Sequence, residues 1–344
     1  MRRSLFPSVA LVILVGSIAG ACRSAPASPA SPTPTSPAAL AATAIVACGR
    51  AVDILTGAPV SSLAVTLDDG GSSLTTADGT FEVTAASAGL HAVTVSGPGV
   101  IQRQTQIRTP AANAALSLIP AQFDLATFDQ MFRDGGALHR WTSAPALVIV
   151  DAVLQFTSVS DSTFTALDER LTEQERASMA ADLTWGLPLA TGNAFTAFSS
   201  ITVESPVAGT KVNFFSRDGR IVVARFRGLS QATGYWGYGR WARRSDEVAA
   251  GAIMIDRDFD AAAGPYVRSL RVHEMGHALG YCHVTKRPSF MNASATWEPN
   301  DFDRDAARVA FQRPPGNQSP DRDPTGYQAG LKAAVGLTWG TITP

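Results

Sequence analysis

The chain has 344 residues, of which 45% are hydrophobic and 17% are charged. A chain of this length and apolar content can bury one sizeable core or two modest ones, and we expect two folded domains. The formal net charge of -1 and the pI near 6.5 give no electrostatic footprint for nucleic acid, so a nucleic-acid partner is not expected.

The N-terminus has the layout of a secretory signal. Arginines precede an apolar run from Val9 to Ile18, and small residues then lead to Cys22. Because a cysteine follows the small residues directly, residues 1–21 resemble a bacterial lipoprotein signal, which implies that Cys22 carries the lipid. We expect a membrane partner through this lipid anchor, at the outer membrane or cell surface. An ordinary signal peptide or an uncleaved anchor is the alternative.

Residues 22–44 form the predicted tether that follows. After the cysteine they are almost entirely Ala, Ser, Pro and Thr. Such a segment lacks the bulky apolar groups that a core needs, and its prolines keep it extended. We therefore expect a stalk between the membrane and the first folded domain.

Residues 45–120 predict a small all-β sandwich. The segments Thr56–Val60 and Thr76–Phe81 resemble the carboxypeptidase regulatory-like domain, in which such segments join neighbouring strands. We expect a spacer or docking module, with binding of a polysaccharide or protein as the alternative. Short β-type runs alternate with turn signals at 45–54, 63–67, 80–84, 91–95, 100–107 and 115–119.

Residues 121–327 carry longer elements and predict an α+β domain. Apolar runs at 147–150, 221–226 and 252–255 are typical of strands. The order of these strands and of the helices between them agrees with an α+β domain. Residues 328–344 carry no pattern that assigns them and are described as a C-terminal tail.

Two helices flank the most informative part of this domain. Thr172–Glu175 is a capping box, so a helix should begin at Thr172 and end near Trp185, before Gly186 and Pro188 stop it. A closing helix is predicted over Asn300–Arg313, capped by Asn300 or by the aspartate that follows it.

Between these helices the sequence reads H-E-x-x-H-x-x-G-x-x-H from His273 to His283. Residues four apart share a helix face, so His273 and His277 can direct their imidazoles at one ion. Gly280 lets the backbone leave the helix and return His283 as a third ligand. Three neutral ligands leave a position open for water, as in catalytic zinc sites, and Glu274 is placed to act as general base. Buried histidines in an ordinary core helix are the alternative, which is costly without a cation.

A methionine-containing step, Ser289–Asn292, follows this motif. With it the chain resembles, over about residues 250–315, the metzincin clan of zinc metalloendopeptidases and its matrixin-like branch in particular. A matrixin has a proline two residues after this methionine where this chain has Ala293, so substrate preference is not carried over. The resemblance implies a metzincin-like catalytic domain with the zinc ligands His273, His277 and His283, the catalytic base Glu274 and the turn methionine Met291.

The resemblance also implies where a substrate binds. In such a domain the strand nearest the zinc cleft pairs with an extended peptide by edge addition, and we expect Gly251–Ile255 to be that strand. An acidic residue of the closing helix, Asp303 or Asp305, is expected to accept hydrogen bonds from the methionine turn. A solvated helix face is the alternative for these aspartates.

Other residues invite metal or redox interpretations. Carboxylates stand at every second position in Asp256, Asp258 and Asp260 and could bind Ca²⁺ through their oxygens. A solvated turn is the alternative. Cys48 resembles the cysteine of a matrixin propeptide, but its flanking residues do not match, so we do not expect latency through it. We also expect no disulfide between Cys48 and Cys282.

These observations lead to one hypothesis with two alternatives. The hypothesis is a zinc-dependent endopeptidase at the cell envelope that acts on a protein or peptide substrate. From a different class comes a surface binding or adhesion lipoprotein whose metal domain is inactive. Hydrolysis of a non-peptide amide, such as one in peptidoglycan, is the other alternative, because the motif defines the chemistry better than the substrate.

Overall fold

The computed structural model describes residues 44–215, 217–326 and 337–339 of the chain. The predicted signal peptide, the lipidation site Cys22 and the tether up to residue 43 lie outside the described residues. Among the helices that are described, none is both long enough and apolar enough to cross a membrane.

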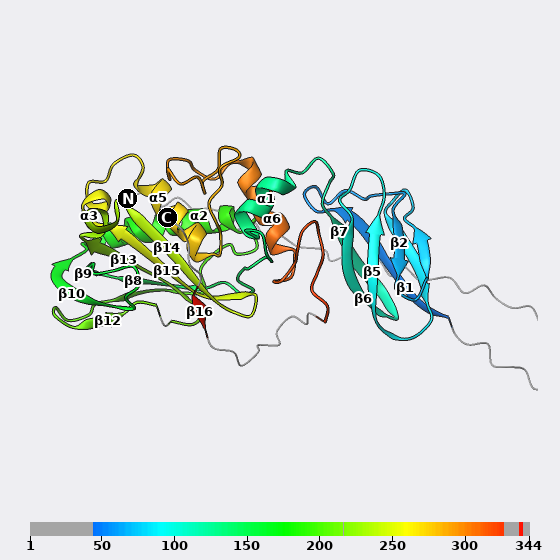
Figure 1. Cartoon of the computed structure of the whole chain (residues 1–344), viewed down its shortest axis with the longest axis horizontal. Helices are drawn as coiled ribbons and strands as arrows, with labels where there is room; N and C mark the ends of the chain where they lie inside the picture. Colours follow the sequence, from blue (N-terminus) through cyan, green and yellow to red (C-terminus); the bar gives the residue numbers. More distant parts are fainter. Residues whose placement is uncertain (1–43, 216, 327–336, 340–344) are drawn as a thin grey trace, which may run out of the picture. The chain divides into compact units, whose positions relative to one another are not determined.

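The prediction that the N-terminal folded part is rich in β-structure is confirmed (Figure 1). Two sheets, with strand orders β4-β1-β7 and β3-β2-β5-β6, share one apolar core. Along β4 every second side chain is buried, as expected for a strand with one face on a core. The strands are β1 (Ile45–Asp53), β2 (Ala64–Leu67), β3 (Ser72–Leu74), β4 (Thr80–Ala85), β5 (Gly89–Ser96), β6 (Arg103–Thr109) and β7 (Ala111–Leu118).

A larger mixed sheet follows in the sequence. Its main path runs β12-β10-β9-β13-β15-β14-β16, and β8 pairs with both β13 and β11. Strands β13 and β15 are parallel, whereas β14 is antiparallel to β15. The strands are β8 (Ala146–Val150), β9 (Ala152–Gln155), β10 (Thr163–Arg170), β11 (Ile201–Glu204), β12 (Lys211–Asn213), β13 (Arg220–Arg227), β14 (Gly237–Arg244), β15 (Glu247–Asp256) and β16 (Thr338–Trp339).

Helices cover one face of this mixed sheet. Helix α5 lies on β14 and β15, and α2 packs against both α5 and α6. A second apolar core lies on the other face, so that Ile253 of β15 faces the helices while its neighbour Met254 faces the second core. The helices are α1 (Leu125–Phe132), α2 (Glu173–Ala190), α3 (Leu229–Thr233), α4 (Arg257–Ala261), α5 (Val267–Ala278) and α6 (Asp301–Phe311).

Helix α2 begins where it was predicted and ends later. Thr172 caps its first turn, but the helix continues through Gly186 and Pro188 instead of ending near Trp185. A Cβ atom on Gly186 would lie 2.8 Å from a methyl carbon of Val272 on α5. The glycine therefore serves close packing between two helices, which its helix-breaking tendency does not reveal.

A buried ion pair follows helix α6 and reaches the N-terminal strands. The side chains of Arg313 and Asp321 are both fully buried, with Nε and Oδ1 2.7 Å apart. The same guanidinium donates hydrogen bonds to the backbone carbonyl and the hydroxyl of Ser117 on β7. The described residues from 44 onwards form one compact unit, so the predicted boundary near residue 120 stays a prediction.

Candidate metal centre

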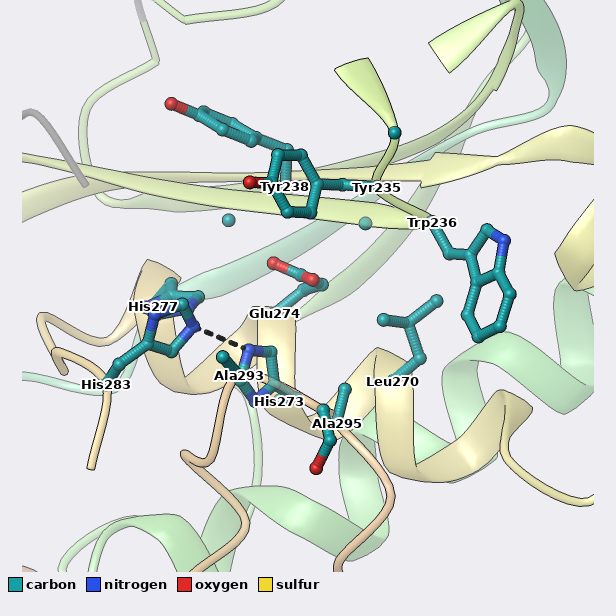
Figure 2. Close-up of a pocket in the computed structure, with 14 residues that line it drawn as sticks. Tyr235, Trp236, Tyr238, Leu270, His273, Glu274, His277, His283, Ala293 and Ala295 are labelled. Atoms are coloured by element: carbon teal, nitrogen blue, oxygen red, sulfur yellow. Dashed lines mark hydrogen bonds between the residues drawn. The ribbon is translucent and has the colours of Figure 1, made fainter. Parts of the chain in front are cut away.

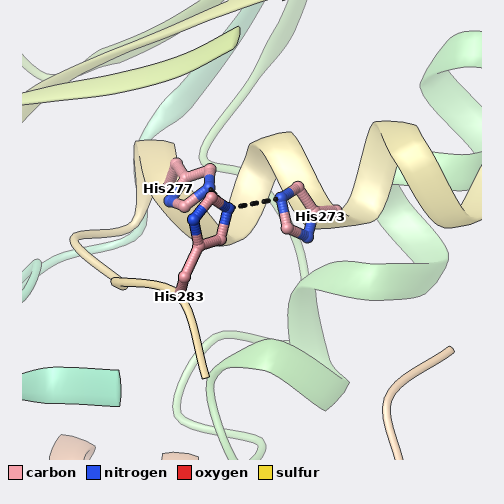
Figure 3. A group of neighbouring side chains, drawn as sticks. All are labelled: His273, His277 and His283. Atoms are coloured by element: carbon pink, nitrogen blue, oxygen red, sulfur yellow. Dashed lines mark hydrogen bonds between the residues drawn. The ribbon is translucent and has the colours of Figure 1, made fainter. Parts of the chain in front are cut away.

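Helix α5 presents His273 and His277 on one face, as their spacing predicts. Both side chains are buried. Beyond the helix, Gly280 adopts a φ of +107°, which glycine reaches at low steric cost. The chain then turns back and brings His283 beside the other two rings (Figure 3). The structure thus brings together all three predicted ligands.

The Nε2 atoms of these imidazoles converge on one point. Nε2 of His283 lies 3.1 Å from Nε2 of His277 and 3.2 Å from Nε2 of His273. On the far side of the rings, Nδ1 of His273 lies 2.7 Å from the carbonyl oxygen of Phe290, and Nδ1 of His277 lies 2.8 Å from that of Tyr281. A neutral imidazole that donates through Nδ1 keeps its lone pair on Nε2, so lone pairs point at one another.

This arrangement fits a zinc ion. Burial lowers the pKa of His273 to about 4 and also lowers the pKa values of His277 and His283, which favours neutral rings. A tetrahedral ion about 2.0–2.1 Å from each nitrogen would place the nitrogens about 3.3 Å apart, close to the separations found. Anchoring of the far ring nitrogen by a carbonyl is also the usual way in which a protein orients a zinc-binding histidine.

The predicted methionine turn lies directly beneath this helix. Phe290 and Met291 are fully buried. A Cβ atom on Gly276 would lie 2.3 Å from the sulfur of Met291, so the helix and the turn approach this closely because residue 276 is glycine. Since the carbonyl of Phe290 accepts the hydrogen bond from His273, the turn also orients this predicted ligand.

Asp303 of helix α6 holds the turn in place. Its carboxylate accepts hydrogen bonds from the hydroxyl of Ser289 at 2.6 Å and from the backbone amide of Phe290 at 3.1 Å. Burial raises the pKa of this carboxyl above its ordinary value. The prediction of an acidic residue that accepts from the turn is confirmed for Asp303, whereas Asp305 faces Arg308 at 3.8 Å.

Glu274 is buried between helix α5 and strand β14 (Figure 2). A Cβ atom on Gly237 would lie 2.3 Å from its Oε1, and one on Gly239 would lie 2.4 Å from its backbone oxygen. Glycine is therefore required at position 239, where the clash is with backbone, whereas a side chain at position 237 would displace the carboxylate of Glu274. Burial raises the pKa of Glu274 to about 8, and a hydrogen bond with the backbone of Gly239 acts in the opposite direction.

Strand β14 is the strand beside the site, and the prediction of Gly251–Ile255 for this place is wrong. Those residues belong to β15, which pairs with β13 on one side and with β14 on the other. A strand buried on both faces reads as a continuous apolar run, and that run is what this segment shows. Gly237 and Gly239 are not among the residues predicted from the sequence as part of the site. Their spacing of two residues, which places them on the same face of a strand, was the available signal.

A pocket of about 250 Å³ adjoins the three histidines. Figure 2 shows Glu274 and the imidazoles at one end and the apolar side chains of Trp236, Leu270 and Ala295 at the other. Among the described residues that line this pocket, Glu274 is the one acid and none is lysine or arginine. The pocket therefore suits uncharged groups next to the converging nitrogens.

The three aspartates predicted as calcium ligands are not brought together. Asp256 caps helix α4 through the amides of that helix, and the exposed Asp258 pairs with the half-buried arginine before it. Asp260 is fully buried between Arg225 and Arg271, at 2.6 and 2.8 Å. Because the segment turns into a helix, its alternating carboxylates point in different directions. This placement corrects the interpretation of the three residues as one calcium-binding set.

The two remaining cysteines occupy different surroundings. Cys48 lies on β1, where its thiol is 3.6 Å from a carboxylate oxygen of Glu82. Cys282 is partly buried next to the predicted ligand His283, and burial raises the pKa of its thiol to about 12. Within the described residues no disulfide joins them. A thiol with a raised pKa stays protonated and is a poor metal ligand at neutral pH.

No family model and no curated protein matches this chain. Among solved structures, it is similar to a chain of a type II cohesin-X-dockerin complex from Acetivibrio cellulolyticus, a C-terminal interface mutant, with 18% sequence identity and a TM-score of 0.18. The likeness covers 21% of this chain and about half, 51%, of that chain. A likeness at this TM-score carries no argument about fold or function.

Proposed function

We propose that this protein is a zinc-dependent endopeptidase with a metzincin-like catalytic domain. The observation that carries the proposal is the convergence of three imidazole nitrogens beside the buried carboxylate of Glu274, in the wall of a pocket. Three neutral nitrogen ligands leave room at the metal for a further ligand, which distinguishes catalytic zinc sites from closed structural ones.

The residues of the site would divide the chemistry of peptide hydrolysis among them. Zinc bound by His273, His277 and His283 supplies polarisation of the scissile carbonyl and a lowered pKa of water. The positive charge of the bound ion would lower the pKa of Glu274, so that its carboxylate could take the proton from the attacking water and then give it to the amine of the leaving group. The backbone of Gly237 and Gly239 keeps the carboxylate at the edge of the pocket, because no side chain stands between them.

Strand β14 supports a peptide as the substrate. It runs along the pocket through Gly237, Tyr238 and Gly239, so its backbone groups pass next to the site. A strand in this position can hold an extended peptide by edge addition, which orients the scissile bond without depending on side-chain sequence. Ala293 lines the pocket where a matrixin-like protein carries proline, so we derive no cleavage preference from the likeness.

The proposal includes anchoring at the cell envelope through Cys22, as the signal-like N-terminus predicts. A binding or adhesion protein with an inactive metal domain is the competing function. The buried Glu274 favours the enzyme, because a purely structural zinc site needs no carboxylate beside the open position.

The test compares Glu274→Gln with the unchanged chain, each loaded with zinc. The substitution keeps the shape of the side chain and removes the base, so kcat/KM for peptide cleavage should fall by about 10²- to 10⁴-fold. Zinc content should remain one ion per chain, since Glu274 is not a ligand. Digestion of a peptide library, with sequencing of the products, supplies a substrate for the rate measurement and tests whether the bond cleaved is a peptide bond.

Glu298→Gln is the matched control. Glu298 is exposed and pairs with Arg268 at 2.6 Å, so the same chemical change there should leave the rate nearly unchanged. Equal rates for Glu274→Gln and the unchanged chain would remove Glu274 from the mechanism. Zinc-loaded protein that cleaves no peptide in the library would favour the adhesion or the non-peptide amide alternative.

A further inference from the structure

Tyr235 stands just before the strand that lines the pocket, in a short link between helix α3 and β14. Its backbone amide donates a hydrogen bond to the hydroxyl of Thr233 at 3.1 Å. The carbonyl of the next residue, Trp236, accepts a hydrogen bond from the backbone amide of Asp256 at 2.7 Å. The backbone is therefore held on both sides of Tyr235, which fixes the point from which its side chain extends.

The side chain of Tyr235 lies at the pocket and is open to solvent. It lines the same pocket as Glu274 and the three histidines. Figure 2 shows its ring extending over the pocket on the side where Glu274 lies. The residue is 44% exposed, so a bound molecule can reach it. Within the part of the chain that the structure describes, its hydroxyl has no hydrogen-bond partner.

Other side chains of the pocket are less able to donate a hydrogen bond into it. The indole of Trp236 is stacked on Phe259, with ring centroids 4.6 Å apart. The ring of Tyr238 packs against the core on the opposite face of the sheet. The hydroxyl of Ser294 lies 3.2 Å from that of a neighbouring threonine. Besides the histidines, the described lining residues with an uncharged donor side chain are Tyr235, Trp236, Tyr238 and Ser294.

Hydrolysis of an amide creates a need for such a donor. When water attacks a peptide carbonyl, negative charge develops on the carbonyl oxygen, and donors already held in place stabilise that charge. Among the described residues that line the pocket, no lysine or arginine is present to do this. A tyrosine hydroxyl can donate without carrying a charge itself, which suits a pocket lined mainly by uncharged groups.

We propose that Tyr235 is a further catalytic residue, whose hydroxyl donates a hydrogen bond to the carbonyl oxygen of the scissile bond as that oxygen gains negative charge. This inference rests on the proposed function. A peptide held along β14 would pass next to Tyr235, because the residue adjoins the first residues of that strand. No proton leaves the hydroxyl, so Glu274 still takes the proton of the attacking water and gives it to the leaving amine.

Tyr235→Phe tests this role, because it removes the hydroxyl and keeps the ring. With the peptide substrate found by library digestion, kcat should fall by about 10- to 100-fold. This is at or below the effect of removing a donor from an enclosed site, since Tyr235 is partly exposed. KM should stay nearly unchanged, because the hydrogen bond becomes strong only in the transition state. Zinc content should remain one ion per chain.

Tyr266→Phe is the matched control. Tyr266 is 49% exposed and is not among the described residues that line the pocket. The same chemical change there should leave kcat and KM nearly unchanged. Equal losses of kcat in the two variants would contradict a role specific to Tyr235.

Inhibitor binding tests the inference without turnover. A phosphinic peptide of the substrate's sequence carries oxygens on a tetrahedral centre and so resembles the transition state, whereas the same peptide with a reduced CH₂–NH bond lacks the carbonyl oxygen. Tyr235→Phe should raise the calorimetric Kd of the phosphinic peptide by about 10- to 100-fold, in line with the loss of kcat/KM. The Kd of the reduced peptide should not change. Equal weakening of both peptides would mean that Tyr235 only packs against the substrate, which would overturn the proposal.

The outcomes separate this inference from the proposed function. If the unchanged chain cleaves the peptide and Tyr235→Phe has the same kcat and the same Kd for the phosphinic peptide, the role of Tyr235 is overturned and the proposed function stands. Loss of zinc from Tyr235→Phe would also overturn it, because the residue would then support the metal centre instead of the substrate. If the zinc-loaded unchanged chain cleaves no peptide, the proposed function fails and the inference fails with it.

Discussion

Two groups of potential metal ligands, each containing histidine, differ in the hydrogen bonds and the pKa shifts of their histidine rings. In one group, on and just after helix α5, His273, His277 and His283 bring their Nε2 atoms together. In the N-terminal β-structure, Asp68, Asp69 and His91 also lie close enough to share an ion. The distances alone do not separate the two groups, so the hydrogen bonds around each ring must decide.

His91 has an acceptor at each ring nitrogen. Nδ1 lies 3.0 Å from a carboxylate oxygen of Asp68, and Nε2 lies 2.9 Å from the carbonyl oxygen of Ser87. The hydrogen bond to Ser87 contributes most to raising the pKa of His91, followed by that to Asp68. Backbone amides donate to the carboxylates of Asp68 and Asp69. The ring is suited to carry both protons, which leaves no lone pair for a metal.

The three rings of the histidine group on and after helix α5 have the opposite arrangement. In His273 and His277 one nitrogen donates to a carbonyl and the other faces its neighbours, and burial lowers the pKa of all three histidines. Proximity of ligand-type residues is thus a weak indicator of a metal site. The partner of the far ring nitrogen and the direction of the pKa shift together separate a zinc site from a protonated histidine.

The largest expected difference is in zinc affinity. His277→Ala removes one of three ligands and should raise the zinc Kd at least about a hundredfold, because roughly 10–16 kcal/mol of binding energy in a four-ligand zinc site is shared among the ligands. His91→Ala should leave both the Kd and the stoichiometry of one ion unchanged. Competition with a chromophoric chelator measures both values. If the unchanged chain bound two zinc ions and His91→Ala bound one, His91 would be a zinc ligand and the two groups would not differ.

The centre on α5 could be predicted because its geometry is local. The spacing from His273 to His277 fixes a helix face, and Gly280 marks the turn before His283. The wall opposite could not be predicted in the same way. Glycine has low strand propensity, so Gly237 and Gly239 do not indicate a strand. They matter because they contact Glu274, which is distant in sequence.

The errors have the same physical origin. Asp260 looked like an oxygen ligand within an acidic run, but its partners Arg225 and Arg271 come from β13 and α5. Gly186 looked like a helix end, but it is in contact with α5. A single residue type predicts local conformation, whereas its partner in the fold is fixed by the arrangement of sheets and helices.

A smaller effect on zinc affinity should follow from Asp303→Ala. Asp303 holds the turn whose Phe290 carbonyl anchors His273. Outer partners of ligand histidines typically change metal affinity by about 10- to 100-fold, and we expect the lower value because Asp303 acts through the turn. Asp305→Ala on the same helix is the control and should leave the affinity unchanged. Equal zinc Kd values for the two variants would show that the turn does not orient the ligand.

The smallest effect concerns the pH dependence of His91. Because its folded-state pKa is raised, its protonated form stabilises the fold fully below the unfolded pKa of about 6.5. That contribution is lost as the pH rises through the folded-state pKa. His91→Gln keeps a hydrogen-bonding side chain but cannot be protonated. The unchanged chain should therefore exceed the variant in Tm by a few degrees near about pH 5, and the difference should shrink near about pH 9.

Calorimetry at several pH values measures this difference. The carboxylates that face His91 are those of Asp68 and Asp69, and their pKa values are lowered mainly by backbone amides that donate to them. Both aspartates therefore stay ionised over this pH range, and the change in Tm difference reports on His91. A Tm difference that grows with pH would mean that the ring is neutral in the folded protein. His91 would then have a lone pair, and the distinction between the two histidine groups would rest on burial and ligand number alone.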